Sequence, residues 1–203
     1  MNSSSRAARR RACLVVPVRR RAAFTVIELV MVVVMIGLLS AVALPRLNNA
    51  ALRADAGVRL VRTLLSSQQR NSITRQSNVI VSFDLTNSRL RIVEDYNNND
   101  TLNTTDRVQF RALGEGVRFR APTMGRIGGT ASSTALVGTD LRTVSAMSSV
   151  IFRRDGSAST DVELYLANRA TVSSDYRAVV INPATGRVDM WRYTGTAWVR
   201  MTN

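Results

Sequence analysis

Phe24-Thr-Val-Ile-Glu-Leu-Val-Met-Val-Val-Val-Met-Ile-Gly-Leu-Leu-Ser-Ala-Val-Ala-Leu44 decides the fold of this chain, because these 21 residues carry a single charge, that of Glu28. A bilayer core about 30 Å thick needs roughly 20 apolar residues as helix, so the stretch is long enough to span a membrane. Seven arginines and no acidic residue precede it: Arg6, Arg9, Arg10, Arg11, Arg19, Arg20 and Arg21. Because positive flanks stay on the cytoplasmic side, residues 1–23 are predicted to be cytoplasmic and the C-terminal bulk to cross.

A secretory signal peptide is the alternative interpretation of the same stretch. The apolar region of such a peptide is usually about 7–15 residues long and ends in a small-residue cleavage site. The stretch here is longer, and Ser40-Ala-Val-Ala43 is its nearest approach to such a site. The residues alone favour the membrane helix and leave the signal peptide open.

Glu28 is the unusual residue, since a carboxylate in a lipid-facing helix costs a few kcal/mol. It either lies shallow enough to reach the lipid headgroups or requires a positively charged partner. Cleavage before Phe24 would create such a partner, a free amine four residues from the carboxylate. The amine of a neighbouring copy could also meet it within an assembly.

Ala23-Phe24-Thr-Val-Ile-Glu28-Leu, between a basic leader and an apolar run that ends at Pro45, resembles the prepilin signal of type IV pilins and type II secretion pseudopilins. The resemblance implies a prepilin peptidase that cleaves between Ala23 and Phe24 and methylates Phe24. It also implies that Glu28, with the run up to Pro45, serves assembly into a filament. The family usually has Gly before the cleavage site, where this chain has Ala23.

Composition bounds the rest of the chain. Of 203 residues, removal of the 23-residue leader leaves 180, enough for one domain and an anchoring helix. The basic residues are all Arg, and the net charge is +14, of which the leader supplies seven charges. A basic surface can attract DNA, anionic lipid or acidic proteins. The all-Arg composition can equally reflect the base composition of the genome.

Cysteine and histidine usage narrows the function classes. Cys13, in the leader, is the single cysteine, and the chain has no histidine. After cleavage no disulfide can form, and the usual zinc ligands and catalytic triads are absent. The sequence therefore predicts a protein that is not an enzyme and has no obligatory cofactor.

Residues 46–76 are predicted to continue the helix beyond the membrane, with a kink at Pro45. Apolar residues recur there at steps of three and four, which places them on one helical face: Leu44, Leu47, Ala51, Ala54, Val58, Val61 and Leu65. We expect this stripe to pack mainly on the chain's own globular domain.

After residue 76 the period changes to that of strands. The pattern predicts two hairpins, 78–84 with 89–94 and 107–113 with 117–120, and further strands at 143–152, 162–167, 176–181 and 187–193. A loop is predicted at 122–142 and a tight turn at 182–186, and residues 193–198 predict a reversal before a short last strand. The fold class is α+β: a long N-terminal transmembrane helix, then an antiparallel β domain over 77–203.

Val150-Ile-Phe-Arg-Arg-Asp-Gly-Ser-Ala158 and Arg177-Ala-Val-Val-Ile-Asn-Pro-Ala-Thr-Gly-Arg-Val188 resemble the domain shared by secretion pseudopilin H and FimT-like minor pilins, the GspH/FimT family. The resemblance implies an inner-membrane minor subunit whose domain is periplasmic, at or near the tip of a type II secretion pseudopilus or a type IV pilus. Its implied partners are other minor and major pilins or pseudopilins, the prepilin peptidase and the inner-membrane assembly platform.

Residues 95–106 resemble a calcium-binding loop in the spacing of their oxygen-bearing side chains. Asp95, Asn97, Asn99 and Asp106 occupy the first, third, fifth and twelfth places. Asp100 stands at the sixth place, where such loops need Gly, and Asp106 is shorter than the usual Glu. A polar turn is the alternative, because Asn and Asp are common in turns.

Gly186-Arg187-Val188-Asp189 is the second candidate binding site. Some FimT-like pilins take up DNA through a Gly-Arg-x-Arg motif in this region, in which arginine contacts phosphate without reading sequence. Asp189 replaces the second arginine of that motif, while Arg192, Arg200, Trp191 and Trp198 could compensate in part. An ordinary hairpin with arginines on its solvent face is the alternative.

Overall fold

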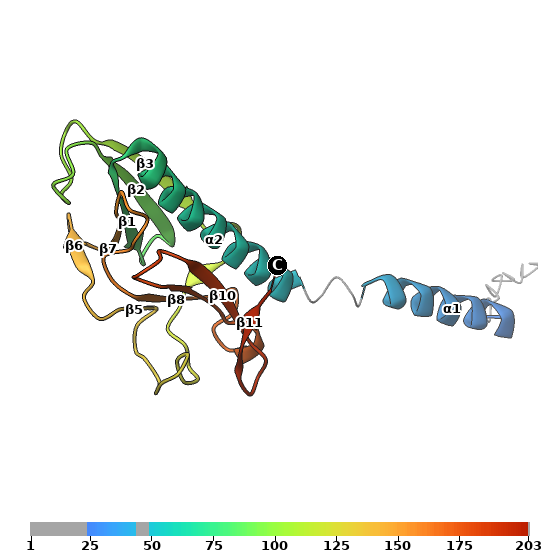
Figure 1. Cartoon of the computed structure of the whole chain (residues 1–203). Helices are drawn as coiled ribbons and strands as arrows, with labels where there is room; N and C mark the ends of the chain where they lie inside the picture. Colours follow the sequence, from blue (N-terminus) through green and yellow to red (C-terminus); the bar gives the residue numbers. More distant parts are fainter. Residues whose placement is uncertain (1–23, 44–48, 203) are drawn as a thin grey trace, which may run out of the picture. The chain divides into compact units, whose positions relative to one another are not determined.

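The computed structural model describes residues 24–43 and 49–202. The chain divides into two compact units, Met1–Pro45 and Arg46–Asn203, which are described separately. The first contains the helix α1, and the second contains the helix α2 and two antiparallel sheets (Figure 1).

The helix α1 comprises Val26–Ala43, inside the predicted membrane stretch. Leu44 and Pro45, which end that stretch, lie outside the described residues, as do the leader and the junction at 44–48 where the kink was predicted. Among the helices in the described part of the chain, none has the combined length and apolarity required to cross a bilayer.

The helix α2 comprises Asn49–Arg75, and its predicted stripe faces the core of the second unit. Ala54, Val58, Val61 and Leu65 are at most 1% exposed. Ala51 is half-buried, and Leu44 and Leu47 lie outside the described residues. The helix ends before Gln76, whose φ of 54° is left-handed and incompatible with a further helical turn.

The first sheet has the strand order β3-β2-β1-β7-β6. Its strands are β1 (Asn78–Asp84), β2 (Arg89–Asp95), β3 (Arg107–Ala112), β6 (Arg142–Val144) and β7 (Met147–Phe152). The predicted hairpin of β1 and β2 is confirmed, with Phe83 opposite Leu90 and Val79 opposite Glu94. The central position of β1, between β2 and β7, explains why all but its first residue are buried.

The second sheet has the order β11-β10-β9-β8-β4, and β5 also pairs with β8. Its strands are β4 (Arg118–Phe119), β5 (Leu136–Val137), β8 (Val162–Ala167), β9 (Arg177–Ile181), β10 (Val188–Tyr193) and β11 (Trp198–Met201). The short 3-10 helix η2 (Ser173–Asp175) precedes β9. Strand β8, the turn at 182–186 and the last reversal agree with the sequence pattern.

One apolar core lies between α2 and the two sheets. Val58, Val61 and Leu65 of α2 join alternate residues of both sheets, among them Val81, Phe83, Phe152, Leu164, Leu166, Val179 and Ile181. A smaller cluster of Ile80, Val93, Val144 and Ile151 lies on the opposite face of the first sheet, and Leu102 packs against it. Both faces of the first sheet are therefore partly covered.

The predicted hairpin of 107–113 and 117–120 is wrong. Strand β3 pairs with β2 in the first sheet, whereas β4 pairs with β8 in the second. Leu113 and Val117 are both buried in the core, and the segment between them crosses from one sheet to the other. Gly114 and Gly116, at φ 88° and 77°, supply the left-handed backbone that the crossing requires.

The strand predicted at 143–152 is instead a hairpin of β6 and β7. Val144 pairs with Met147, so that the turn contains only Ser145 and Ala146, both at positive φ. This is the backbone of the two-residue turns that match strand twist, usually made by Asn or Gly. Neither residue is typical of such a turn, so that the turn could not be predicted from the residue types.

The two segments that carry the second resemblance meet at the C-terminal half of α2. The amide of Ala158 donates a hydrogen bond to the carbonyl of Pro183 at 2.8 Å. The side-chain amide of Gln69 donates to the carbonyls of Gly156 and Thr185, at 3.0 and 2.6 Å. The helix thus holds together two turns that are far apart in the sequence.

Candidate functional site

The predicted processing and assembly residues lie at the start of α1. Ala23 is outside the described residues, and Phe24 is 80% exposed. The backbone amide of Glu28 donates to the Thr25 hydroxyl at 3.3 Å and to the Thr25 carbonyl at 3.1 Å. Thr25 followed three residues later by Glu is the sequence pattern of a helix-capping box.

The Thr25 hydroxyl thus caps α1 through the backbone amide of Glu28, a contact that the sequence analysis missed although Thr25-x-x-Glu28 was visible in the sequence. The carboxylate lies in the first turn of α1, where the helix dipole favours a negative charge. Within the described residues no cation forms an ion pair with it.

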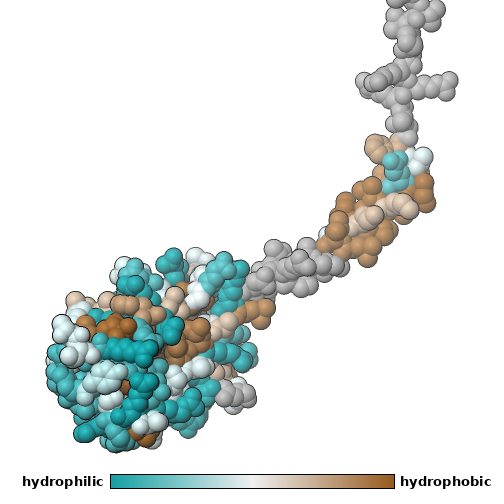
Figure 2. Space-filling view, turned by 90° about the horizontal axis from the view of Figure 1, so that it is seen from above, coloured by the Kyte–Doolittle hydropathy of each residue, from teal (hydrophilic) through white to brown (hydrophobic). Residues whose placement is uncertain are grey.

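The apolar side chains of α1 are exposed all round the helix. From Val26 at 82% to Leu39 at 68%, every large apolar residue of this stretch is exposed, and Figure 2 shows the helix as a nearly continuous apolar surface. Contiguous apolar surfaces of this kind mark sites of contact with proteins or membranes.

The predicted calcium loop is held by hydrogen bonds to its own backbone. Asp95, fully buried, accepts from the amides of Asn99 and Asp100, at 3.3 and 2.8 Å. The side-chain oxygen of Asn99 accepts from Thr101, and that of Asn97 accepts from the amide of Asn99. These oxygens thus support the turn that the alternative interpretation predicted.

The remaining candidate ligand, Asp106, accepts the amide of Asn103 through Oδ2 at 2.8 Å. Its Oδ1 is buried and has no hydrogen-bond partner. Asp100 forms an ion pair with Arg142, and Leu102, at the eighth place, packs on the first sheet. Across residues 24–43 and 49–202, no three Asp, Glu, Cys or His side chains are placed to hold a metal. Calcium binding, whose ligand set would include Asn oxygens, stays a prediction that calorimetric titration with millimolar calcium tests.

The three arginines predicted to contact DNA lie together at β10, β11 and the preceding turn. Asp189 accepts from Nε of Arg187 at 3.1 Å and forms an ion pair with Arg200. Arg192 lines a neighbouring cavity of about 300 Å³ that Arg200 shares. Asp189, which replaces the second arginine of the Gly-Arg-x-Arg pattern, thus binds both Arg187 before β10 and Arg200 on β11.

Two arginines of α2 belong to the same group, and the sequence analysis did not identify them as candidate DNA contacts. Arg59 lines the same cavity as Arg192, and Arg62 lines a second cavity of about 250 Å³ with Arg187 and Arg200. They are about 130 residues from β10 in the sequence, so that only the packing of α2 on β10 brings them there. We call Arg59, Arg62, Arg187, Arg192 and Arg200 the arginine cluster.

The predicted stacking surfaces of the two tryptophans are partly used inside the domain. Trp198 contacts the rings of Tyr165 and Tyr193, at centroid distances of 5.4 and 5.3 Å, and donates its indole N–H to the carbonyl of Gly125. Burial and the hydrogen bond to Glu163 raise the pKa of the Tyr165 hydroxyl. Trp191 is half-buried, so that neither indole is fully open to a base.

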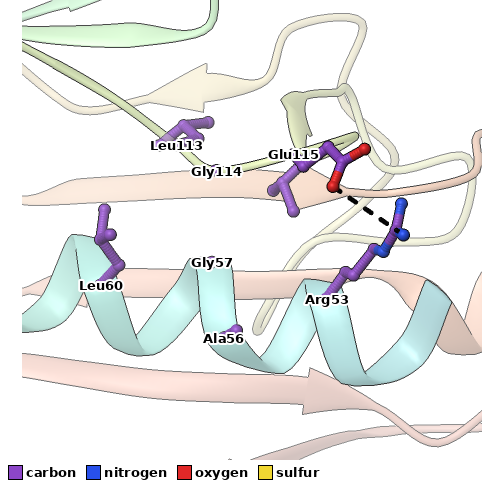
Figure 3. A pocket seen from close by; sticks show the side chains of 8 residues that line it. Arg53, Ala56, Gly57, Leu60, Leu113, Gly114 and Glu115 are labelled. Carbon is purple, nitrogen blue, oxygen red and sulfur yellow. Dashed lines mark ion pairs between the residues drawn. The ribbon is translucent and has the colours of Figure 1, made fainter. Parts of the chain in front are cut away.

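A small apolar notch of about 160 Å³ lies between α2 and the crossing segment that follows β3 (Figure 3). Gly57 and Leu60 line it from the helix and Val117 from the crossing. A Cβ added at Gly57 would lie 2.9 Å from Val117, so that glycine allows the crossing to approach the helix. Arg53 and Glu115 form a long ion pair of 3.9 Å at its rim.

Comparison with known proteins gives a likeness in fold. No protein-family model matches the chain, and no curated protein matches it in sequence. Two similar solved structures are both of the minor pseudopilin EpsH from the type II secretion system of Vibrio cholerae. The first has a TM-score of 0.44 and 14% identity and covers 67% of this chain and 94% of that one. The second has a TM-score of 0.41 and 12% identity and covers 74% and 94%. At such values the likeness assigns neither a site nor a function.

The serines at the centre of the first sheet, Ser82 and Ser149, are buried and hydrogen-bonded to each other at 2.8 Å. Arg91 also donates hydrogen bonds to the Ser82 hydroxyl. The exposed surfaces of the described residues include α1, the arginine cluster and the strand edges.

Proposed function

We propose that the chain is a minor pilin-like subunit, a pseudopilin, that assembles at or near the tip of a type II secretion pseudopilus or a type IV pilus. The leader would remain cytoplasmic until prepilin peptidase cleaves between Ala23 and Phe24 and methylates Phe24. The stretch 24–45 would then anchor the protein in the inner membrane, and the β domain would lie in the periplasm.

The observation that carries this proposal is the single carboxylate on an otherwise apolar, exposed helix. An anchor that only had to hold a domain in the membrane would gain from Glu28 only the helix-dipole contribution of about 0.3–1 kcal/mol, which is less than the few kcal/mol that the charge costs in lipid. A subunit that assembles can recover this cost when the carboxylate meets the amine of a neighbouring N-terminus.

The N-terminal residue and mass of the protein test the proposal, measured in cells with and without prepilin peptidase. We expect a methylated Phe24 only where the peptidase is present. An intact leader in both cells would indicate a simple anchored protein. Cleavage after Ala43 would indicate a secreted protein and would exclude the pilin assignment.

DNA binding for natural transformation is the second candidate function, and the arginine cluster is the observation that favours it. Five arginines line two adjacent cavities, and Asp189 is the only acidic residue among the described ones that binds Arg187 and Arg200. Arginines gathered on one surface bind phosphate without reading sequence, and such binding weakens as salt rises.

The substitution Asp189→Asn tests this candidate because it keeps the side-chain size and releases both arginines. Each additional phosphate contact steepens the salt dependence of the binding constant by about 0.9 on a log–log plot. Two released arginines therefore predict a slope steeper by up to roughly 1.8. A gel shift that is absent, or that is unchanged by salt and by the substitution, would exclude DNA binding at this cluster.

A further inference from the structure

Among the residues that the structure describes, no strand pairs with the outer edge of β3, so that this edge of the first sheet is open. Strand β3 pairs with β2 on one side and ends the sheet on the other. Five of its six residues are exposed and the sixth is half-buried. An open edge presents unpaired backbone N–H and C=O groups, to which an extended segment of another chain can add as a strand. We propose that the β3 edge is a docking site for an extended segment of a partner protein in which acidic and apolar residues alternate.

The two faces of β3 differ in chemistry, and this difference predicts the alternation of acidic and apolar residues in the partner segment. Val108 lies opposite Val93 and Phe110 opposite Arg91, so that both share the face of the small outer cluster. Arg107 and Arg111 alternate with them and face the other way. A strand added to this edge would place successive side chains beside an apolar face and then beside a basic face.

The basic face sets the charge of the partner. Within the described part of the chain, neither Arg107 nor Arg111 forms an ion pair. Arg107 lies opposite Glu94, but that carboxylate pairs with Arg75 of α2, and Asp84 pairs with Arg89 of β2. Opposite charges directly across two strands stabilise pairing, and like charges oppose it. A second copy of this chain would bring two further arginines to the same seam, so that an acidic partner fits better than self-pairing.

The apolar face supplies the second contact. Val108 is 40% exposed and Phe110 46%, which leaves both available to a docked side chain. The guanidinium of Arg89 lies 4.3 Å from the centre of the Phe110 ring and is held by Asp84 at 2.7 Å. One face of the ring is thus fixed by a cation–π contact, and the ring is positioned rather than mobile.

Charges on an edge strand can also serve only to prevent aggregation, and the test must separate this role from docking. The probe is a fluorescent six-residue peptide in which Glu and Val alternate, the length of β3. Its controls are a peptide of the same composition with the Glu and Val residues in two blocks, and an alternating Lys–Val peptide. Anisotropy is measured with the full chain in detergent micelles, with hydrogen exchange of the β3 amides as a second readout.

We expect the alternating Glu–Val peptide to bind about tenfold more tightly than either control and to slow amide exchange in β3. The double variant Arg107→Glu with Arg111→Glu should reverse the preference towards the Lys–Val peptide. Arg118→Glu, an exposed arginine on β4 in the other sheet, is the matched control and should change nothing. Because these side chains are exposed, the variants should keep the circular dichroism spectrum of the wild type.

Equal binding of all three peptides, or binding that does not reverse in the double variant, would overturn the proposal. Self-association that the double variant abolishes, without peptide binding, would show that the edge pairs with a second copy instead. The proposal does not rest on the pilin assignment, since edge docking can hold or fail whether or not Phe24 is the mature N-terminus.

Discussion

Glu28 has two candidate roles, the local cap of α1 and a charge needed for assembly, and substitutions at Thr25 and Glu28 separate them. Thr25→Ala removes the hydroxyl that accepts the Glu28 amide at 3.3 Å, and loss of such a cap costs roughly 1 kcal/mol of helix stability. Glu28→Gln keeps the capping pattern, which accepts Gln at this place, and loses only the dipole contribution of about 0.3–1 kcal/mol.

The assembly role predicts a larger effect for the same Gln substitution. If the carboxylate meets an amine in a dry interface, removal of one partner leaves an uncompensated charge at a cost of roughly 3–5 kcal/mol. At about 1.4 kcal/mol per factor of ten, this is a loss of more than 100-fold in the association constant. Glu28→Gln and Glu28→Ala should then both abolish assembly, while Thr25→Ala should weaken it by about tenfold or less.

The assay is the amount of subunit recovered in sheared filaments relative to the membrane fraction, in cells that contain the other assembly components. Helix content of each variant in detergent is measured in parallel, and Met31→Leu, a substitution that keeps the volume of an exposed apolar residue, is the control. Normal assembly of Glu28→Gln would refute the reasoning, because the charge would then be unnecessary and Glu28 would serve the cap alone.

Three further predictions concern the domain. Hydrogen bonds from Asn87, with the nearby Arg89, hold the pKa of Asp84 at about 2, below its ordinary 3.8, so its stabilisation is present above about pH 4 and is lost as pH falls towards 2. Asp84→Asn should lower the free energy of unfolding by about 1–2 kcal/mol at pH 7, which is less than the full pKa shift implies because solvent screens the pair of Asp84 and Arg89. Urea unfolding should show that the difference between the variant and the wild type shrinks at low pH. An equal loss at both pH values would contradict the proposed dependence of stability on the ionisation of Asp84. Gly186→Ala should lower the free energy of unfolding by roughly 2–4 kcal/mol, because φ is 61° and the new Cβ would collide with the Gly156 carbonyl. Gly195→Ala, at φ 102° with open space around it, should lower the free energy of unfolding by less in the same assay. Leu65→Ala should lower the free energy of unfolding by about 2–5 kcal/mol, because Leu65 is buried in the core. Leu52 is 65% exposed, so Leu52→Ala should lower it by much less. Similar losses in the two variants would mean that α2 is not packed as described.

Local signals in the sequence predicted those elements whose partners follow them directly. The hairpin of β1 and β2 consists of two short runs rich in apolar residues around a Thr-Asn-Ser turn, and its strands pair with each other. The turn after β9 carries Asn182, whose side chain accepts the amide of Thr185, and Gly186 at positive φ. Each of these features lies within a single continuous segment, the longer of which is Asn78–Asp95.

Elements whose partners are distant could not be placed in this way. The residues of β3 and β4 have the same alternation as a hairpin, but Leu113 and Val117 satisfy their burial by crossing the core instead. Strand periodicity predicts which residues of a strand share a face and says nothing about the sheet that it joins. The turn at Ser145 and Ala146 was missed for a different reason, because both residues have positive φ although neither residue type favours it.

The candidate site shows the same limit. Arg187, Arg192 and Arg200 were predicted to contact DNA. The structure joins Arg187 and Arg200 to Asp189, which the sequence analysis identified only as a departure from a motif. Arg59 and Arg62 reach the same cavities through the packing of α2 on β10, a contact between segments about 130 residues apart. The capping pattern of Thr25 and Glu28, by contrast, was present in the sequence, but Glu28 was interpreted only through contact with the lipid headgroups or with a positively charged partner.

The exposed surfaces of α1 and β3 differ in how much they can specify. A helix that is apolar on all sides can associate strongly, but it has no preferred face, so apolar contact alone does not fix the rotation of one subunit against another. A strand edge is different, because a one-residue slip exchanges the two faces of the added strand and would place acidic side chains against Val108 and Phe110 instead of Arg107 and Arg111. An association that uses both surfaces would take its strength from α1 and its register from β3. Loss of the β3 arginines should therefore change which partner binds more than how much subunit enters the assembly.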